Sequence, residues 1–116
     1  MEIITKDGKV YKFEFAHYGE KRELNATDEE LIVADEIVKM LPPADDYDII
    51  RKSSNYISVV KGDWDVARIK FTEKAKWVNV CCVDAGKVKR PIERPEDVER
   101  FRDDFIKSYE HIMKYS

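Results

Sequence analysis

The segment between Tyr47 and Val83 limits the fold of this 116-residue chain more than any other part of it. It is rich in β-branched and aromatic residues, which favour strands. These residues fall into four blocks, near 47–52, 55–60, 64–71 and 76–83. The connections between the blocks are short and mostly polar. We therefore expect up to four antiparallel strands in this segment.

One register keeps the two faces of the last three strands distinct, whereas a slip of one residue would invert a strand. Two pairs at the connections define it: Phe71 with Lys76, and Val60 with Trp64. On one face, this register places Ile57 opposite Ala67 and Ile69 opposite Val78. That face is apolar and is the expected core side of the sheet.

The opposite face combines aromatic, basic and polar side chains. Tyr56, Arg68 and Asn79 share one row, and Lys70 lies opposite Trp77. Rings and cations placed together suit stacking on bases or holding anions. The plainer interpretation is that the cations lean on the rings of a solvated sheet and add modest stability. These five residues are the candidate binding residues.

A β-hairpin is expected before this segment. Residues 3–5 and 9–16 flank Asp7-Gly8, a dipeptide that tolerates the positive φ angles of a tight primed turn. In the second strand, Tyr11, Phe13 and Phe15 share one face, so that strand has the alternation of a half-buried element.

Two helices are expected, one on each side of the β-rich segment. The first begins at a capping box, Thr27-Asp28-Glu29-Glu30, and runs to about Leu41, where Pro42-Pro43 stops it. The second opens at Pro95, with acidic residues in its first turn, and continues to about Tyr115. Apolar residues recur at helical spacing in both segments.

Together these elements predict one α+β domain over residues 1–116. The expected order is ββαββββα, an antiparallel β-sheet made of a β-hairpin and a β-meander, with two helices packed on one face. A chain of this length buries roughly two-thirds of its unfolded surface, which is enough for a core without disulfides or metals.

The sequence offers no sign of a membrane or secreted protein. Its longest apolar runs, such as 56–60 and 77–83, are far shorter than the roughly 20 residues that cross a bilayer. The N-terminus lacks the basic and apolar regions of a signal peptide. Cys81 and Cys82 are neighbours whose side chains point to opposite faces of a strand, so reduced thiols are expected. We expect a cytoplasmic protein.

Residue types that carry catalysis are sparse. His17 lies beside an expected turn, and His111 lies in the last turns of the final helix, where the helix dipole favours an imidazolium. Neither the cysteines nor the histidines have the spacing of a zinc site. The four glycines are isolated, and the acidic run 45–48 is interpreted as a solvated loop. We therefore predict a protein that is not an enzyme, with no cofactor and no metal.

The small net charge of −3 hides two charged regions. Residues 20–48 contain ten acidic and three basic residues, whereas residues 51–90 contain ten basic and four acidic residues. The basic region includes the candidate face, and Lys87-Val88-Lys89-Arg90 extends it. A nucleic acid or an acidic protein would suit this region.

The leading hypothesis is a small interaction module, monomer or homodimer, that contacts nucleic acid or a protein partner through the basic aromatic sheet face. DNA, RNA and an acidic protein are all compatible with the pattern. The alternative is an acidic inhibitor of a nuclease or defence enzyme, resembling anti-CRISPR proteins and encoded by a phage or mobile element. Its surface would be the acidic first helix with its flank: Asp28, Glu29, Glu30, Asp35, Glu36, Asp45, Asp46 and Asp48.

Two stretches carry a resemblance to known modules. The string Asn55-Tyr-Ile-Ser-Val-Val-Lys-Gly-Asp-Trp-Asp-Val-Ala-Arg-Ile-Lys-Phe and its continuation to Val80 resemble small uncharacterised modules of bacteria and their mobile elements. Some of those modules are appended to exonuclease-like or other nucleic-acid-processing proteins. The ending, with Pro95-Glu96-Asp97-Val98 and residues 106–110, is similar to the closing helix of a short domain associated with bacterial nucleases and predicted transport proteins. Over residues 47–112, the resemblance implies an accessory role around nucleic acid or defence systems.

Overall fold

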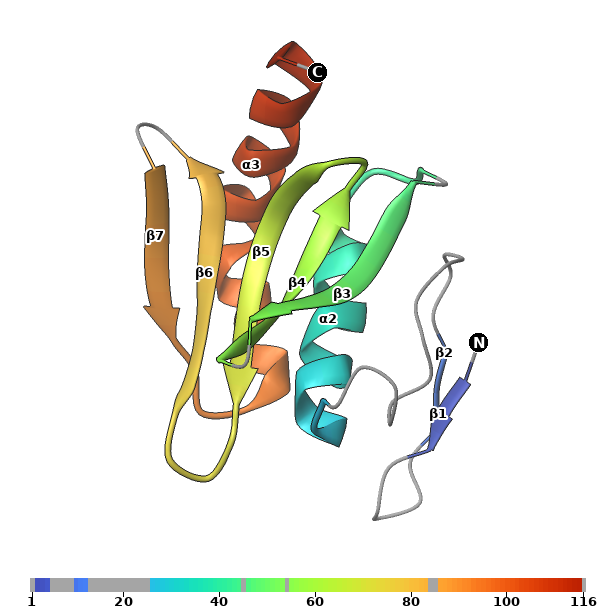
Figure 1. Ribbon diagram of the computed structural model, residues 1–116, viewed down its shortest axis with the longest axis vertical. Helices are drawn as coiled ribbons and strands as arrows, with labels where there is room; N and C mark the ends of the chain where they lie inside the picture. The colour runs from blue at the N-terminus through green and yellow to red at the C-terminus, as the bar shows by residue number, and fades with distance from the viewer. Residues whose placement is uncertain are drawn as a thin grey trace.

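The computed structural model describes residues 2–4, 10–12, 26–44, 46–53, 55–83 and 86–115 (Figure 1). Its strands are β1 (Glu2–Ile4), β2 (Val10–Lys12), β3 (Tyr47–Ser53), β4 (Tyr56–Lys61), β5 (Trp64–Phe71), β6 (Lys76–Val83) and β7 (Gly86–Pro91). Its helices are α2 (Asp28–Met40), the 3₁₀ helix η1 (Pro95–Phe101) and α3 (Arg102–Tyr115). The α+β class predicted from the sequence is confirmed.

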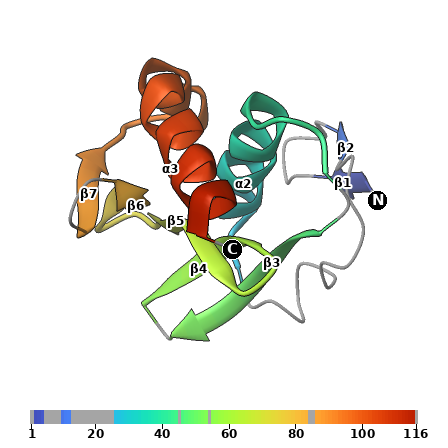
Figure 2. The same ribbon diagram turned by 90° about the horizontal axis from the view of Figure 1, so that it is seen from above.

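The main sheet is an antiparallel meander of five strands in the order β3-β4-β5-β6-β7. Strands β1 and β2 form a separate two-stranded antiparallel sheet, in which Ile3 pairs with Tyr11. Helices α2 and α3 both lie on one face of the main sheet, as Figure 2 shows from above. The predicted hairpin turn, Phe13, Phe15 and His17 lie outside the described residues.

The predicted register between β5 and β6 is confirmed: Phe71 pairs with Lys76, Ile69 with Val78, and Ala67 with Val80. The predicted register between β4 and β5 is wrong. Lys61, rather than Val60, pairs with Trp64, and Ile57 lies opposite Ile69 instead of Ala67.

The cause of this difference is a tight turn followed by a β-bulge. The turn consists of Gly62 and Asp63, and Gly62 adopts a φ of 58°, which favours glycine. Beyond the turn, Val60 pairs with Asp65 while Val59 pairs with Ala67, so Val66 is one extra residue in β5. Without this extra residue, the apolar face of β4 would lie opposite the polar face of β5.

The first predicted helix is confirmed, with its capping box. The Thr27 hydroxyl accepts a hydrogen bond from the Glu30 amide at 3.1 Å, and the Glu30 carboxylate accepts one from the Thr27 amide at 2.9 Å. The helix ends at Met40, and Leu41 is the C-cap that precedes the two prolines.

Two features near the C-terminus differ from the prediction. The predicted order has four strands between the two helices, whereas the structure has a fifth, β7, an edge strand paired with β6. The last helix begins as a 3₁₀ helix at Pro95 and becomes α-helical only from Arg102. The Asp97 carboxylate accepts hydrogen bonds from the amides of Glu93 and Arg94, which satisfies backbone groups at the start of η1.

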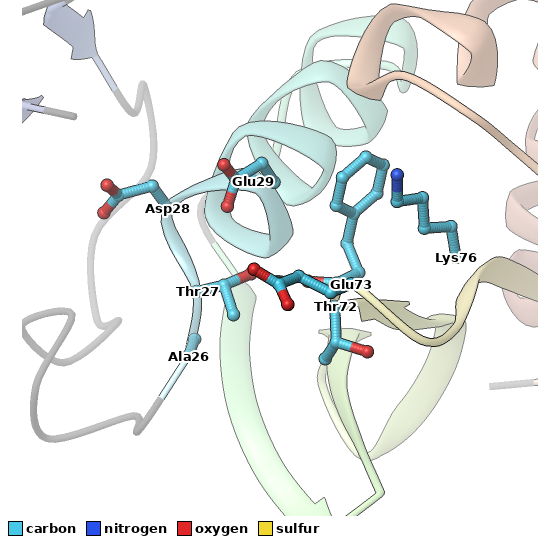
Figure 3. Close-up of a pocket in the computed structure, with 8 residues that line it drawn as sticks. Ala26, Thr27, Asp28, Glu29, Thr72, Glu73 and Lys76 are labelled. Atoms are coloured by element: carbon cyan, nitrogen blue, oxygen red, sulfur yellow. Dashed lines mark hydrogen bonds between the residues drawn. The ribbon is translucent and has the colours of Figure 1, made fainter. Parts of the chain in front are cut away.

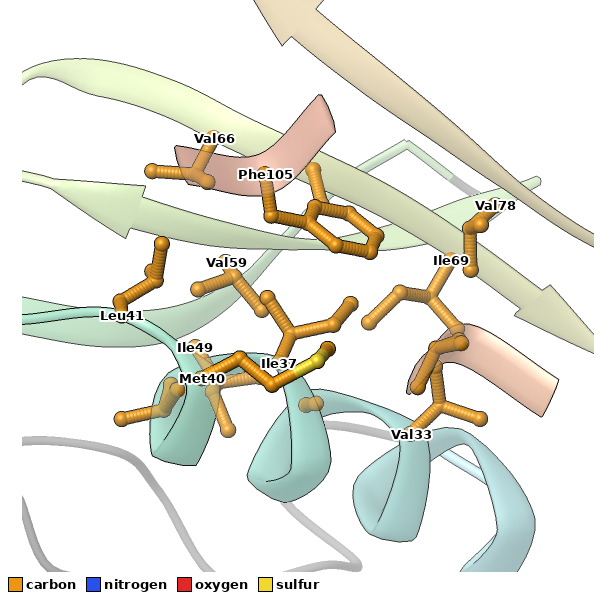
Figure 4. Packing of buried hydrophobic residues seen from close by; sticks show 14 of the residues in the cluster. Val33, Ile37, Met40, Leu41, Ile49, Val59, Val66, Ile69, Val78 and Phe105 are labelled. Carbon is orange, nitrogen blue, oxygen red and sulfur yellow. The ribbon is translucent and has the colours of Figure 1, made fainter. Parts of the chain in front are cut away.

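A single cluster of buried apolar side chains fills the space between the sheet and the helices. Ile37 of α2 and Phe105 of α3 are fully buried and face strand residues such as Val59 and Ile69 (Figure 4). The two helices α2 and α3 therefore cover the core side of the main sheet. Within the described residues, no helix is long and apolar enough to span a membrane.

Candidate functional site

The face of the main sheet that points away from α2 and α3 is called the open face below. It includes Tyr56, Arg68, Lys70, Trp77, Asn79 and Lys89. Alternation along the strands creates it: in β4, Ile57 and Val59 enter the core, so Tyr56 and Ser58 lie on the other side. Among the described helices, none covers this face (Figure 2).

All five side chains proposed from the sequence lie on the open face. Arg68 pairs with Asn79, and Lys70 pairs with Trp77, as predicted. The row predicted for Tyr56 is displaced, because the bulge places Ser58 directly opposite Arg68. Tyr56 still contacts Arg68, now from a diagonal position.

Two aromatic rings form the centre of the face. The ring centroids of Tyr56 and Trp77 are 6.5 Å apart, and the rings are inclined by 52°. The guanidinium carbon of Arg68 lies 4.8 Å from the Tyr56 centroid, and Lys89 Nζ lies 5.3 Å from the Trp77 centroid. Each ring thus has a cation within the distance of a cation–π interaction.

Lys89 also belongs to the open face, because β7 pairs with β6 and continues the sheet. The sequence marked residues 87–90 only as a basic extension, and the alternation in β7 separates its members. Lys89 pairs with Asn79 on the open face. Arg90 turns to the helix side instead, where it forms an ion pair with Asp104 at 3.0 Å and stacks on Phe101.

Asp65 accepts a hydrogen bond from Arg68 Nε at 3.1 Å. Partial burial alone would lower the pKa of the Arg68 guanidinium. The hydrogen bond to Asp65 and the proximity of Tyr56 outweigh that effect, so its pKa is raised and the charge is retained. Within the described part of the chain, neither Lys70 nor Lys89 forms an ion pair with a carboxylate. The face therefore carries cations beyond the one that Asp65 neutralises.

The small side chains that lie beside the aromatic and basic side chains of the open face are buried. Ser58 has no exposed surface, and its hydroxyl has no hydrogen-bond partner among the described residues. Cys81 is also buried. A buried thiol in a strand is poorly placed to act as a nucleophile.

Two other residues considered for chemistry, His111 and Asp46, have structural contacts, whereas His17 and Asp45 lie outside the described residues. His111 packs edge-on against Trp64, with centroids 6.4 Å apart, and lies 4.7 Å from the ring of Tyr115. Asp46 binds Lys61 Nζ at 2.8 Å. In the described residues, no group of three or more histidine, cysteine, aspartate or glutamate side chains is arranged to hold a metal.

A cavity of about 480 Å³ lies where the N-terminus of α2 meets the turn between β5 and β6 (Figure 3). Its charged lining includes Glu29, Glu73 and Lys76. It shares no residue with the open face.

The acidic face predicted for the first helix is only partly on the surface. Asp28, Glu30 and Asp35 are buried, and Asp35 forms an ion pair with Lys39 at 2.8 Å. Glu29 is exposed. Glu36 is partly buried, and this burial, opposed by Lys39, raises the pKa of its carboxyl group.

Comparisons with known proteins add no assignment. No protein-family model matches the chain, no curated protein matches it, and no solved structure matches it. The interpretation of the site therefore depends on its own geometry.

Proposed function

We propose that this protein is a non-enzymatic interaction module that binds nucleic acid through the open face. The observation that carries the proposal is the pair of aromatic rings, Tyr56 and Trp77, each with a cation beside it, on a sheet face that none of the described helices covers.

The chemistry of this face fits nucleic acid because it offers partners for both parts of a nucleotide. Rings stack on bases of any sequence, and such stacking contributes about 1–3 kcal/mol per base. Lys70 and Lys89 supply charge for phosphates, and Asn79 supplies a donor and an acceptor for base edges or sugars. The resemblance expected for residues 47–112 implies the same kind of role, because some of those modules are appended to nucleic-acid-processing proteins.

The net negative charge of the chain does not oppose this proposal. Exposed charges are screened over about 8–10 Å at physiological salt, so a ligand responds mainly to the face it touches. Arg68, Lys70 and Lys89 lie together on the open face, and Arg68 already has its counter-ion in Asp65. Lys70 and Lys89 therefore give this face a local positive charge.

The test is fluorescence anisotropy with labelled single-stranded and duplex oligonucleotides over a series of salt concentrations. Binding should occur at low salt and weaken as salt rises, because phosphate contacts release counterions. The double variant Arg68→Glu with Lys70→Glu should lose at least about tenfold in affinity. Its matched control is Lys107→Glu with Lys114→Glu, which changes the net charge equally through exposed residues of α3.

Two results would count against the proposal. One is the absence of binding at low salt, and the other is equal binding by the open-face variant and its control. If an acidic protein, rather than an oligonucleotide, bound to this face, the interaction surface would stand but the ligand class would be wrong.

The acidic-inhibitor alternative has less support. It requires a helix that presents a row of carboxylates, and α2 buries three of the five that the sequence suggested: Asp28, Glu30 and Asp35. Reversal of the charges at Glu29 and Glu36 would test that alternative against a captured enzyme.

A further inference from the structure

We infer that Arg68 is a pre-positioned phosphate ligand for single-stranded nucleic acid, that Asp65 is the residue that positions it, and that one base stacks on Trp77. This inference rests on the proposed function and specifies how the open face would hold a nucleotide.

The Arg68 side chain is held from two sides. Its Nε group donates a hydrogen bond to Asp65 Oδ2 at 3.1 Å, and its guanidinium lies 4.8 Å from the centroid of the Tyr56 ring. A long arginine side chain loses much rotamer freedom when it binds a ligand. Contacts that already restrict it reduce the entropy that ligand binding must remove.

The part of Arg68 that best fits a phosphate is its pair of Nη groups. Among the described residues, none accepts a hydrogen bond from the Nη1 or Nη2 groups of Arg68. These two groups form the fork that binds phosphate oxygens in a bidentate manner. The side chain is 23% exposed, so a ligand can reach it from solvent.

The position of the Asp65 carboxylate favours a residue that positions Arg68 over one that competes with phosphate for the guanidinium. A carboxylate that competed with phosphate would occupy the Nη fork through both oxygens. Asp65 instead accepts from Nε, at the inner edge of the guanidinium, and its side chain is only 11% exposed. A phosphate and Asp65 can therefore bind Arg68 at the same time.

The β-bulge is what brings these two residues together. Residues three apart in a regular strand lie on opposite faces. The extra residue Val66 restores Asp65 to the face of Arg68, because Asp65 pairs with Val60 and Arg68 pairs with Ser58. Bulges commonly redirect a side chain beside a functional site. The same irregularity that sets the β4–β5 register thus builds the Asp65–Arg68 pair.

Trp77 is the better platform for a base. The cation beside the Tyr56 ring is the partly buried Arg68 guanidinium, whereas the cation beside the Trp77 ring is the exposed side chain of Lys89. The bases of a duplex are stacked on one another, so a ring on a sheet surface reaches an exposed base face in a single strand. We therefore expect single strands to bind more tightly than duplexes.

The experiment is a double-mutant cycle measured with a labelled single strand of roughly ten nucleotides. Asp65→Ala removes the charge and the acceptor, whereas Asp65→Asn removes the charge and keeps an acceptor for Nε. Asp63→Asn, in the exposed turn, is the control for loss of one negative charge close to the face. Far-UV circular dichroism and thermal midpoints identify the variants that remain folded.

We expect Asp65→Ala to weaken binding by about fivefold or more, and Asp65→Asn to bind within about twofold of the wild type. Asp63→Asn should bind as tightly as the wild type or slightly more tightly. In an Arg68→Lys background, which lacks the fork, Asp65→Ala should have little further effect. If Asp65→Ala does not fold, the comparison of Asp65→Asn with Asp63→Asn decides, since a competitor would make Asp65→Asn clearly tighter.

The outcomes separate this inference from the proposed function. If the wild type binds and loss of Trp77 abolishes binding, but Asp65→Ala binds as tightly as Asp63→Asn, only the positioning role is wrong. Equal affinity for duplex and single strand would refute the stacking arrangement. Absence of binding by the wild type would refute both proposals.

Discussion

The Glu30 carboxylate accepts a hydrogen bond from the Phe71 amide at 3.1 Å, although the two residues are 41 positions apart in the chain. Thr27 makes a second link, since its hydroxyl donates to the Phe71 carbonyl at 2.9 Å. The capping box of α2 thus also connects this helix to the end of β5 by two hydrogen bonds.

Glu30→Ala should therefore destabilise the protein more than loss of a surface helix cap does. The change removes the acceptor for the amides of Thr27 and Phe71, both partly or fully shielded from water. We expect a loss of about 2–4 kcal/mol in the free energy of unfolding, measured by urea denaturation. Glu29→Ala, at the exposed neighbouring position, should change it by less than about 0.5 kcal/mol. Equal effects of the two substitutions on the free energy of unfolding would contradict a stabilising role for the hydrogen bond between Glu30 and Phe71.

The acid limb of the stability curve should depend on Asp97. Hydrogen bonds from the amides of Glu93 and Arg94, with a further contribution from Arg100, lower the pKa of this carboxyl from 3.8 to about 2. A carboxyl with a lowered pKa stabilises the folded state above its unfolded pKa, and this stabilisation disappears as the pH falls through the folded pKa. The contribution should be complete above about pH 5 and lost between about pH 4 and pH 2.

Asp97→Asn tests this dependence, since the amide does not titrate. Urea midpoints measured between pH 2 and pH 7 should fall less steeply with acid in the variant than in the wild type. Asp103→Asn, at an exposed position in the first turn of α3, is the control and should retain the wild-type slope. A variant curve parallel to the wild-type curve would contradict the role of Asp97.

Two fully buried serines should respond in opposite directions to replacement by alanine. The Ser108 hydroxyl donates to the Val66 carbonyl at 3.4 Å, at the bulge, whereas the Ser58 hydroxyl has no partner among the described residues. Ser108→Ala should cost about 1 kcal/mol, and Ser58→Ala should leave stability unchanged or raise it by up to about 1 kcal/mol. Thermal denaturation of the two variants side by side measures the difference. Destabilisation of both to the same degree would contradict the assignment of Ser58 as unpaired.

Local patterns were enough to predict much of this fold. The capping box at Thr27 identifies the start of α2. The short connection between β5 and β6 allows one register that keeps the two faces of the sheet consistent. The clustering of four of the five candidate residues followed from that register, because Arg68 and Lys70 face Asn79 and Trp77 across one hairpin.

The features that could not be predicted from the sequence have no local residue pattern that marks them. A bulge is a single extra residue, and nothing in the composition of β5 marks Val66 as that residue. Strand β7 contains one apolar side chain, Val88, among basic residues, which is typical of a protected edge strand and gives little alternation to detect. The burial of Asp28 and Asp35 depends on tertiary packing, which charge patterns along a helix do not reveal.

Trp77 should report ligand binding by its fluorescence. The chain has two tryptophans, and they lie in different environments. Trp77 lies on the open face beside Tyr56, whereas Trp64 packs edge-on against His111 of α3. Stacking of a base on Trp77 should quench its emission, while Trp64 should be unaffected. The experiment is a titration of the wild type, Trp64→Phe and Trp77→Phe with a single-stranded oligonucleotide.

Quenching should persist in Trp64→Phe and vanish in Trp77→Phe. Trp77→Ala should in addition lose about tenfold or more in affinity, because a stacked base contributes about 1–3 kcal/mol. The matched substitution Trp64→Ala removes an aromatic ring of the same size from outside the open face, so any loss of affinity there would reflect altered folding rather than a lost contact. Quenching that survives in Trp77→Phe would place the base elsewhere, and the open face would then no longer account for binding.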